Sequence, residues 1–197
     1  MLSKDSIILE ERREMTKKTI IVLAEGFEEI EAVTPIDILR RVGVDVIVVG
    51  LNEILVKGAH DVIINADARL DDIDFIPDAV IFPGGALGAK NLARSEKLKE
   101  LILTMNKEER IIAAICASPA LLLAPLGILD GKRATCYPSM EEEFSEAVHP
   151  AEEQVVQDEN IITSKGPGTS AMFAFVVAEN IVGSGKIESA RKAMLFI

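Results

Sequence analysis

Thr19-Ile-Ile-Val-Leu-Ala24 is a short apolar run rich in β-branched residues, and Asp45-Val-Ile-Val-Val-Gly-Leu51 repeats the pattern. Both runs have the character of buried strands. Between them, residues 28–42 place apolar side chains among charges at helical spacing, and Gly43 follows where a left-handed helix cap is common. Pro35 is expected to kink or restart this helix. Strand, helix and strand in this order predict a βαβ unit with parallel strands.

The alternation of strands and helices continues along the rest of the chain. Further strands are expected at residues 55–58, 61–65, 79–82, 111–115, 133–137, 153–156 and 161–164. Further helices are expected at residues 86–93, 96–107, 117–124, 141–147 and 186–195, with one that residues 166–170 open and that runs to about residue 182. We therefore expect a single α/β domain over residues 16–197, in which helices cover both faces of a mostly parallel sheet. Residues 1–15 are expected to form an N-terminal extension, with Met15 as a candidate start.

Composition excludes several classes of protein. Of the 197 residues, 49% are apolar, which is enough for a packed core and excludes a disordered or fibrous chain. The 21 Lys+Arg and 32 Asp+Glu give a net charge of -11, so a nucleic-acid partner is not expected. No apolar run reaches the ~20 residues that span a bilayer, so no membrane association is expected. Two cysteines cannot form a disulfide framework, which favours free thiols in the cytoplasm.

Cys116 directly follows a predicted strand and precedes a predicted helix. Amides at a helix N-terminus would lower the pKa of the thiol and make it both a nucleophile and a target of oxidation. The alternative is a small buried apolar side chain. Gly84 and Gly85 follow another strand and form either a simple turn or, with the amide of Ala117, a set of donors for a developing oxyanion.

Glu28, Glu29 and Glu31 lie in the first turn of the first predicted helix. Carboxylates are favoured there by the helix dipole, so solvated capping is one interpretation of all three. A carboxyl buried against Cys116 would instead have a raised pKa and could relay a proton.

Four segments occur in order along residues 17–195, namely Ala24-Glu-Gly-Phe-Glu-Glu-Ile-Glu31, Pro83-Gly-Gly85, Ala113-Ala-Ile-Cys-Ala-Ser-Pro119 and Thr163-Ser-Lys-Gly-Pro-Gly-Thr-Ser170. Together they resemble the ThiJ/PfpI superfamily, and within it the ThiJ-like branch that includes the parkinsonism-associated protein deglycase. The resemblance implies a flavodoxin-like, class I glutamine amidotransferase-like fold. It also implies a homodimer with the helix at residues 28–42 near its interface.

The resemblance also implies a role for each matching residue. Cys116 is the implied nucleophile and redox-sensitive thiol, and Glu31 is its hydrogen-bonding carboxyl. The amides of Gly85 and Ala117 are the implied oxyanion hole. The other implied pocket residues are Gly84, Gly166 and Pro167.

Two positions depart from the family pattern. Ala117 stands where the protease-like branch has a histidine directly after its cysteine, so the peptidase interpretation loses its base. Tyr137 stands where many ThiJ-like members have a histidine, and tyrosine is a poor base at neutral pH. Tyr137 is expected to form a pocket wall. On the expected strand its neighbour Cys136 points the opposite way and is a core thiol, or alternatively a resolving cysteine.

His60 and His149 are the only two histidines, and both are expected in solvated turns or loops. Their spacing does not match a set of metal ligands, so neither a metal nor an organic cofactor is expected.

The predicted function is a glutathione-independent glyoxalase or deglycase, a lyase or hydrolase that acts on methylglyoxal, glyoxal or their early adducts and protects against stress. Cys116 would attack the aldehyde, and Glu31 would move a proton between adjacent carbons. The alternative is an oxidative-stress sensor or redox chaperone in which Cys116 is oxidised to sulfinate. No residue supports a third possibility, thiazole biosynthesis.

Overall fold

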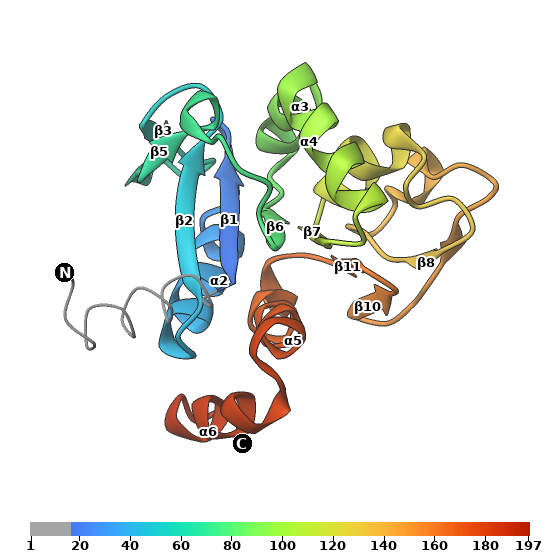
Figure 1. Cartoon of the computed structure of the whole chain (residues 1–197). Coiled ribbons are helices and arrows are strands. Elements are labelled where there is room, and N and C mark those ends of the chain that lie inside the picture. Colours follow the sequence, from blue (N-terminus) through green and yellow to red (C-terminus); the bar gives the residue numbers. More distant parts are fainter. Residues whose placement is uncertain (1–16) are drawn as a thin grey trace, which may run out of the picture.

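The structure, a computed structural model, describes residues 17–197, so the expected extension and Met15 lie outside the described residues. At its centre is a seven-stranded sheet in the order β10-β11-β7-β6-β1-β2-β5 (Figure 1). Neighbouring strands are parallel, except that β10 pairs antiparallel with β11. These strands are β1 (Lys18–Leu23), β2 (Asp45–Gly50), β5 (Ala68–Arg69), β6 (Ala79–Phe82), β7 (Ile111–Ile115), β10 (Val155–Asp158) and β11 (Ile161–Ser164).

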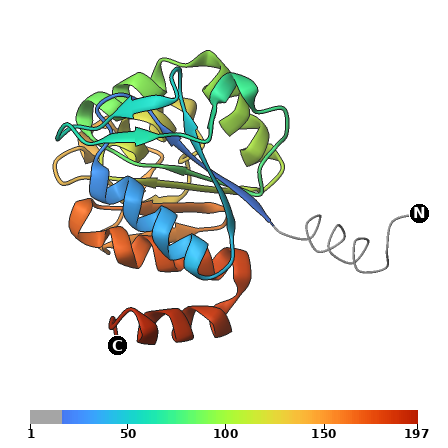
Figure 2. The same cartoon turned by 90° about the vertical axis from the view of Figure 1, so that its left-hand side faces the viewer.

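Alternate side chains of the central strand β1 pack into two separate cores. Ile21 and Leu23 belong to the core under α2 (Glu29–Arg41) and α5 (Ser170–Val182). Ile20 and Val22 belong to the core on the other face, under α3 (Ala86–Ala93) and α4 (Glu96–Lys107). Because side chains alternate along a strand, a continuous apolar run fills both faces of the sheet, as expected for parallel strands covered by helices. Figure 2 shows α2 and α5 together on one side of the sheet.

The remaining elements lie at the periphery of the sheet. The helix α6 (Ser184–Ala193) packs on α5. Two small sheets pair β3 (Leu55–Lys57) with β4 (Ile63–Asn65) and β8 (Arg133–Ala134) with β9 (His149–Pro150). None of the helices within residues 17–197 has the length and apolar character needed to cross a membrane.

Three sequence predictions of local structure were wrong. Residues 117–124 do not form a regular α-helix, because the segment is a π-helical turn, Pro119–Leu123, followed by a 3-10 turn, Ala124–Leu126. The strand expected at residues 133–137 ends at Ala134. The acidic helix expected at residues 141–147 is one 3-10 turn, Glu141–Glu143. In the first helix, Pro35 causes no restart, since α2 continues through it.

The order of the strands determines where loops meet at the carboxyl edge of the sheet. From β1 the chain passes outward to β2, and it later returns to place β6 on the other side of β1. The loops after β1 and β6 therefore diverge at a topological switch point, where open α/β sheets bind ligands. β7 lies beside β6, so the loop that begins at Cys116 reaches the same edge.

Candidate active site

Cys116 occupies a strained turn at the end of β7. Its φ is 64°, a left-handed conformation that is uncommon for residues other than glycine. The backbone holds this turn from both sides, because the Cys116 amide donates to the Ser164 carbonyl at 2.9 Å and the Cys116 carbonyl accepts from the Tyr137 amide at 2.8 Å. The side chain is 8% exposed. The fold thus fixes this cysteine at a sharp elbow and leaves it slightly accessible.

Glu31, in the first turn of α2, is fully buried beside Cys116. Its Oε2 accepts a hydrogen bond of 2.7 Å from the Gly84 amide, across 53 positions of sequence. Its Oε1 has no hydrogen-bond partner within residues 17–197. A buried polar atom without a partner is costly and is often found at functional sites. Of the three glutamates at the start of α2, Glu31 is therefore the one that faces the cysteine.

Burial changes the ionisation of both side chains. It raises the pKa of Glu31 from 4.5 to about 7, with a further increase from the charge of Glu28, although the Gly84 amide and the Cys116 thiol act in the opposite direction. It also raises the pKa of the Cys116 thiol to about 12, and the negative charge of Glu31 contributes to this increase. The expectation that a helix N-terminus lowers the thiol pKa was wrong, because no regular helix follows and because burial and Glu31 outweigh the amides. Since each anion opposes the other, the pair carries at most one negative charge at neutral pH.

The loop of Gly84 and Gly85 packs directly against this pair. A Cβ on Gly84 would lie 2.6 Å from the Cys116 Cβ and 2.8 Å from Glu31 Oε2, so only glycine fits. The amides of Gly85 and Ala117 hydrogen-bond to the Cys116 sulfur and lower its pKa, against the stronger effect of burial. These are the two amides that the resemblance implies for an oxyanion hole.

Tyr137 and Gly166 also border the site. Tyr137 is 48% exposed. A Cβ on Gly166 would lie 3.4 Å from Tyr137 Cδ2 and 3.9 Å from Glu31 Oε1. Pro167 follows in a 3-10 turn, Pro167–Thr169. Thr169 Oγ1 accepts from the Gly166 amide at 3.1 Å and donates to its carbonyl at 2.8 Å, so this side chain holds the loop.

Cys136 is completely buried, whereas Cys116 is slightly exposed. Its Sγ lies 3.5 Å from the Tyr137 carbonyl oxygen. Burial, together with the charges of Glu141 and Cys116, raises the pKa of this thiol to about 12. Both cysteines are free. The burial of Cys136 agrees with the expected core thiol, although the strand that was to orient it does not extend this far.

With this geometry established, comparisons with known proteins identify the family. The model of the DJ-1/PfpI family matches residues 17–180. The chain belongs to the DJ-1/PfpI family. It is 39% identical to the Parkinson disease protein 7 homolog of Danio rerio, over 85% of this chain and 91% of that protein. It is 36% identical to the glutathione-independent glyoxalase DJR-1.2 of Caenorhabditis elegans, over 90% of this chain and 96% of that protein.

Solved structures of DJ-1/PfpI family members share the fold. The crystal structure of Drosophila melanogaster DJ-1beta superposes with a TM-score of 0.88 at 37% identity, over 92% of this chain and 98% of that one. These matches confirm the resemblance and the flavodoxin-like fold predicted from the sequence. Some relatives are longer, since the chain covers only 40% of the length of protein DJ-1 homolog B from Arabidopsis thaliana, to which it is 39% identical.

The sequence analysis of this DJ-1/PfpI family member missed one residue of the site, Ser118. Its hydroxyl donates a 2.6 Å hydrogen bond to the Pro83 carbonyl, and both groups are buried. This bond joins the elbow after Cys116 to the loop that supplies Gly84 and Gly85. The available signal was a polar residue two positions after the cysteine in an otherwise apolar segment.

Glu28, Glu29 and His60 form a second group of polar side chains near the start of α2. Each offers one possible metal-ligand atom, and these atoms lie within 4.8 Å of one another. Glu29 is already engaged, since its Oε1 accepts from the His60 amide at 2.6 Å and its Oε2 lies 2.8 Å from His60 Nδ1. His60 lies 31 positions after Glu29, a spacing that sequence rules for metal sites do not detect.

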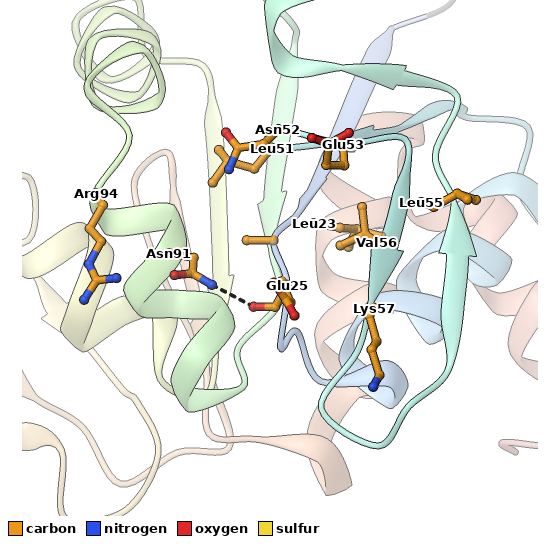
Figure 3. A pocket seen from close by; sticks show the side chains of 11 residues that line it. Leu23, Glu25, Leu51, Asn52, Glu53, Leu55, Val56, Lys57, Asn91 and Arg94 are labelled. Atoms are coloured by element: carbon orange, nitrogen blue, oxygen red, sulfur yellow. Dashed lines mark hydrogen bonds between the residues drawn. The ribbon is translucent and has the colours of Figure 1, made fainter.

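A cavity of about 460 Å³ lies beyond the carboxyl ends of β1 and β2. Figure 3 shows that Asn91 of α3 and Arg94, directly after α3, line it, with Lys57 on the side of β3. The Asn91 side chain donates to the Glu25 carbonyl at 2.9 Å, which ties α3 to the loop after β1. Cys116 and Glu31 do not line this cavity.

Proposed function

We propose that this protein is a glutathione-independent glyoxalase or deglycase with a stress-protective role, acting on methylglyoxal, glyoxal or their early adducts. The observation that carries the proposal is the buried Glu31 carboxyl beside Cys116, with its pKa raised to about 7. A carboxyl with this pKa can both accept and donate a proton at neutral pH, as proton transfer between adjacent carbons requires. The glyoxalase name of a relative that is 36% identical supports the same chemistry.

In the first step, the Cys116 sulfur bonds to the aldehyde carbon of the substrate. Glu31 accepts the thiol proton as the bond forms and passes it to the former aldehyde oxygen, which gives a hemithioacetal. The need for this transfer follows from the pKa of the thiol, about 12, which leaves little free thiolate at neutral pH. The amides of Gly85 and Ala117 donate to the negative charge that develops at the sulfur and the neighbouring oxygen.

In the second step, Glu31 removes the hydrogen of the carbon bonded to sulfur and returns a proton to the adjacent carbonyl carbon, while the hydroxyl proton of the hemithioacetal moves to the oxygen of that adjacent carbon. The first carbon is oxidised to a thioester while the second is reduced to an alcohol, so no external electron carrier takes part. Water then cleaves the carbon–sulfur bond, releases lactate from methylglyoxal or glycolate from glyoxal, and restores the thiol. None of these steps uses a metal or an organic cofactor.

Replacement of Cys116 with alanine is expected to abolish conversion of methylglyoxal to lactate in the absence of glutathione. The reason is that no other accessible thiol is available, since Cys136 is fully buried. Lactate formation is measured for the wild type and for Cys116→Ala, with Cys136→Ala as the matched cysteine control. Full turnover by Cys116→Ala would contradict the proposal, and so would absence of turnover in the freshly reduced wild type.

A second candidate function is a redox sensor or redox chaperone in which Cys116 is oxidised to sulfinate. The observation that favours it is Glu31 Oε1, which is buried, has no hydrogen-bond partner within residues 17–197, and belongs to a carboxyl beside the sulfur. A protonated carboxyl here could donate to a sulfinate oxygen, as could the amides of Gly85 and Ala117. We also propose a cytoplasmic location, because both cysteines are free.

We further propose that the protein forms a homodimer through α2 and the β3–β4 hairpin. The two elements are neighbours, since the Ala59 amide donates to the Phe27 carbonyl at 2.8 Å. Both elements carry large apolar side chains that are about half exposed or more, namely Ile30 and Val33 on α2 and Leu55, Val62 and Ile63 on the hairpin. Exposed apolar side chains that form one patch mark interaction surfaces.

Val33→Asp is expected to shift the protein from dimer to monomer, because an aspartate cannot be buried without a partner. Sedimentation velocity at micromolar concentration should show twice the chain mass for the wild type and a single chain mass for the variant. Leu103→Asp is the control, since Leu103 is a similarly exposed apolar residue on α4, on the other face of the sheet. A wild type that sediments as a monomer would contradict the dimer.

A further inference from the structure

We propose that the site prefers 2-oxoaldehydes with an aromatic substituent, and that Tyr137 and Gly166 determine this preference. The inference rests on the proposed function, and it names the substrate class of the same site. Gly166 lies close to both the Tyr137 ring and the Glu31 carboxyl.

The missing side chain of Gly166 leaves one position unfilled between two groups. A Cβ there would lie 3.4 and 3.8 Å from Tyr137 Cδ2 and Cε2, and 3.9 Å from Glu31 Oε1. These are ordinary van der Waals distances. The backbone at Gly166 is extended, with a φ of 164°, so its conformation alone would accept any residue. The backbone conformation therefore does not require a glycine at position 166. The effect of the glycine is to leave the position beside the Tyr137 ring without a side chain.

A 2-oxoaldehyde bound in this site would meet these groups in the order of its own atoms. Its aldehyde carbon would bond to the Cys116 sulfur, and its keto carbon would exchange a proton with Glu31. The substituent of the keto carbon would then lie toward Gly166 and the Tyr137 ring. A methyl group leaves most of the half-exposed ring uncovered, whereas a phenyl group can pack against it.

The position of the ring is coupled to the nucleophile through the backbone. The Tyr137 amide donates to the Cys116 carbonyl at 2.8 Å. The loop of Gly166 is held by Thr169, whose Oγ1 hydrogen-bonds to both the amide and the carbonyl of Gly166. Both walls are therefore set before a substrate binds, which lowers the entropic cost of selecting a flat substituent.

The test uses two neutral ketones that lack the aldehyde, 2-hydroxyacetophenone and hydroxyacetone, which differ in carrying a phenyl or a methyl group. Each is used to protect Cys116 from iodoacetamide, and alkylation is quantified on the Cys116 peptide by mass spectrometry. In the wild type the phenyl ketone should protect at about tenfold lower concentration than the methyl ketone, the size expected for packing against an aromatic ring. Tyr137→Ala should abolish this ratio, and Tyr137→Phe should retain it.

Gly166→Ala provides a second variant that leaves the ring in place. Its methyl group would occupy the space beside the ring, so protection by the phenyl ketone should weaken while protection by the methyl ketone changes little. Equal protection by the two ketones in the wild type, or none by either, would overturn the inference. Conversion of methylglyoxal and phenylglyoxal is measured separately, so that phenyl-dependent protection without turnover would remove the proposed function and retain the aromatic preference.

Discussion

Glu31→Gln is expected to lower turnover of methylglyoxal by about 10²- to 10⁴-fold, the range lost when a general acid–base group is removed. Glutamine has nearly the same shape and can still accept the hydrogen bond that the Gly84 amide donates to Oε2 at 2.7 Å. It cannot exchange a proton, so the step between the two substrate carbons has no carrier. The measurement is lactate formation by the variant and by the wild type without glutathione.

The same variant separates the two candidate functions. Cys116 in Glu31→Gln should still be oxidised by peroxide, since the thiol and the amides of Gly85 and Ala117 are retained. Loss of turnover with an oxidisable cysteine would support a proton relay. Unchanged turnover would eliminate Glu31 as the relay and leave the redox role as the better interpretation.

The pH dependence of stability tests whether the Glu31 carboxyl has the raised pKa and whether Glu31→Gln removes it. Burial raises the pKa of Glu31 from 4.5 to about 7, so the folded protein binds this proton more tightly than the unfolded chain does. The stabilisation is complete below pH 4.5 and is lost as the pH rises through about 7. The free energy of unfolding from urea titrations should therefore fall over this interval in the wild type, and the fall should be smaller in Glu31→Gln.

Gly85→Ala is expected to destabilise the fold by about 3 kcal/mol and to abolish turnover. A φ of 83° at this position disfavours any side chain, at a cost of about 1–2 kcal/mol. A Cβ would also lie 2.3 Å from the Gly26 carbonyl oxygen and 2.9 Å from the Glu28 amide. Both contacts are with backbone, which cannot rotate away, so the loop must move and withdraw its amide from the Cys116 sulfur. Overpacking of this kind costs a further 1–3 kcal/mol, roughly.

Gly43→Ala is the matched control for this prediction. Gly43 also has a positive φ, 85°, but a Cβ there would have no neighbour within 4 Å. Its substitution should cost only the conformational part, about 1–2 kcal/mol, and should leave turnover unchanged. Equal destabilisation of the two variants in urea titrations would show that the contact with Gly26 is not the cause.

The elements at the centre of the sheet were predictable because their residues obey simple patterns. The apolar run at residues 19–24 has no charged residue and fills two cores, and the spacing of residues 28–42 requires one buried helix face. Cys116 could be placed at a strand end, since residues 111–115 are uniformly apolar. These features depend on local sequence, which is why they were confirmed.

The properties that failed prediction depend on contacts between distant segments. The raised pKa of Cys116 arises from burial and from Glu31, 85 positions earlier, and no local pattern reveals their sum. Tyr137 lies beyond the end of β8, and its amide donates to the carbonyl of Cys116, which is distant in sequence. The engagement of Glu29 by His60 likewise joins the start of α2 to a turn that is far away in sequence.

The hydrogen bond between the Gly84 amide and Glu31 has a consequence for how the protein matures. Glu31 lies on α2, Gly84 in the loop after β6, and Cys116 in the turn after β7. The native surroundings of the thiol therefore form only after these three segments have packed together. In a partly folded chain the thiol would have the ordinary pKa of about 8.5 and would react with electrophiles far more readily. Completion of the fold thus slows the reaction of this cysteine with unspecific electrophiles. The selectivity of the thiol is therefore acquired only at a late stage of folding.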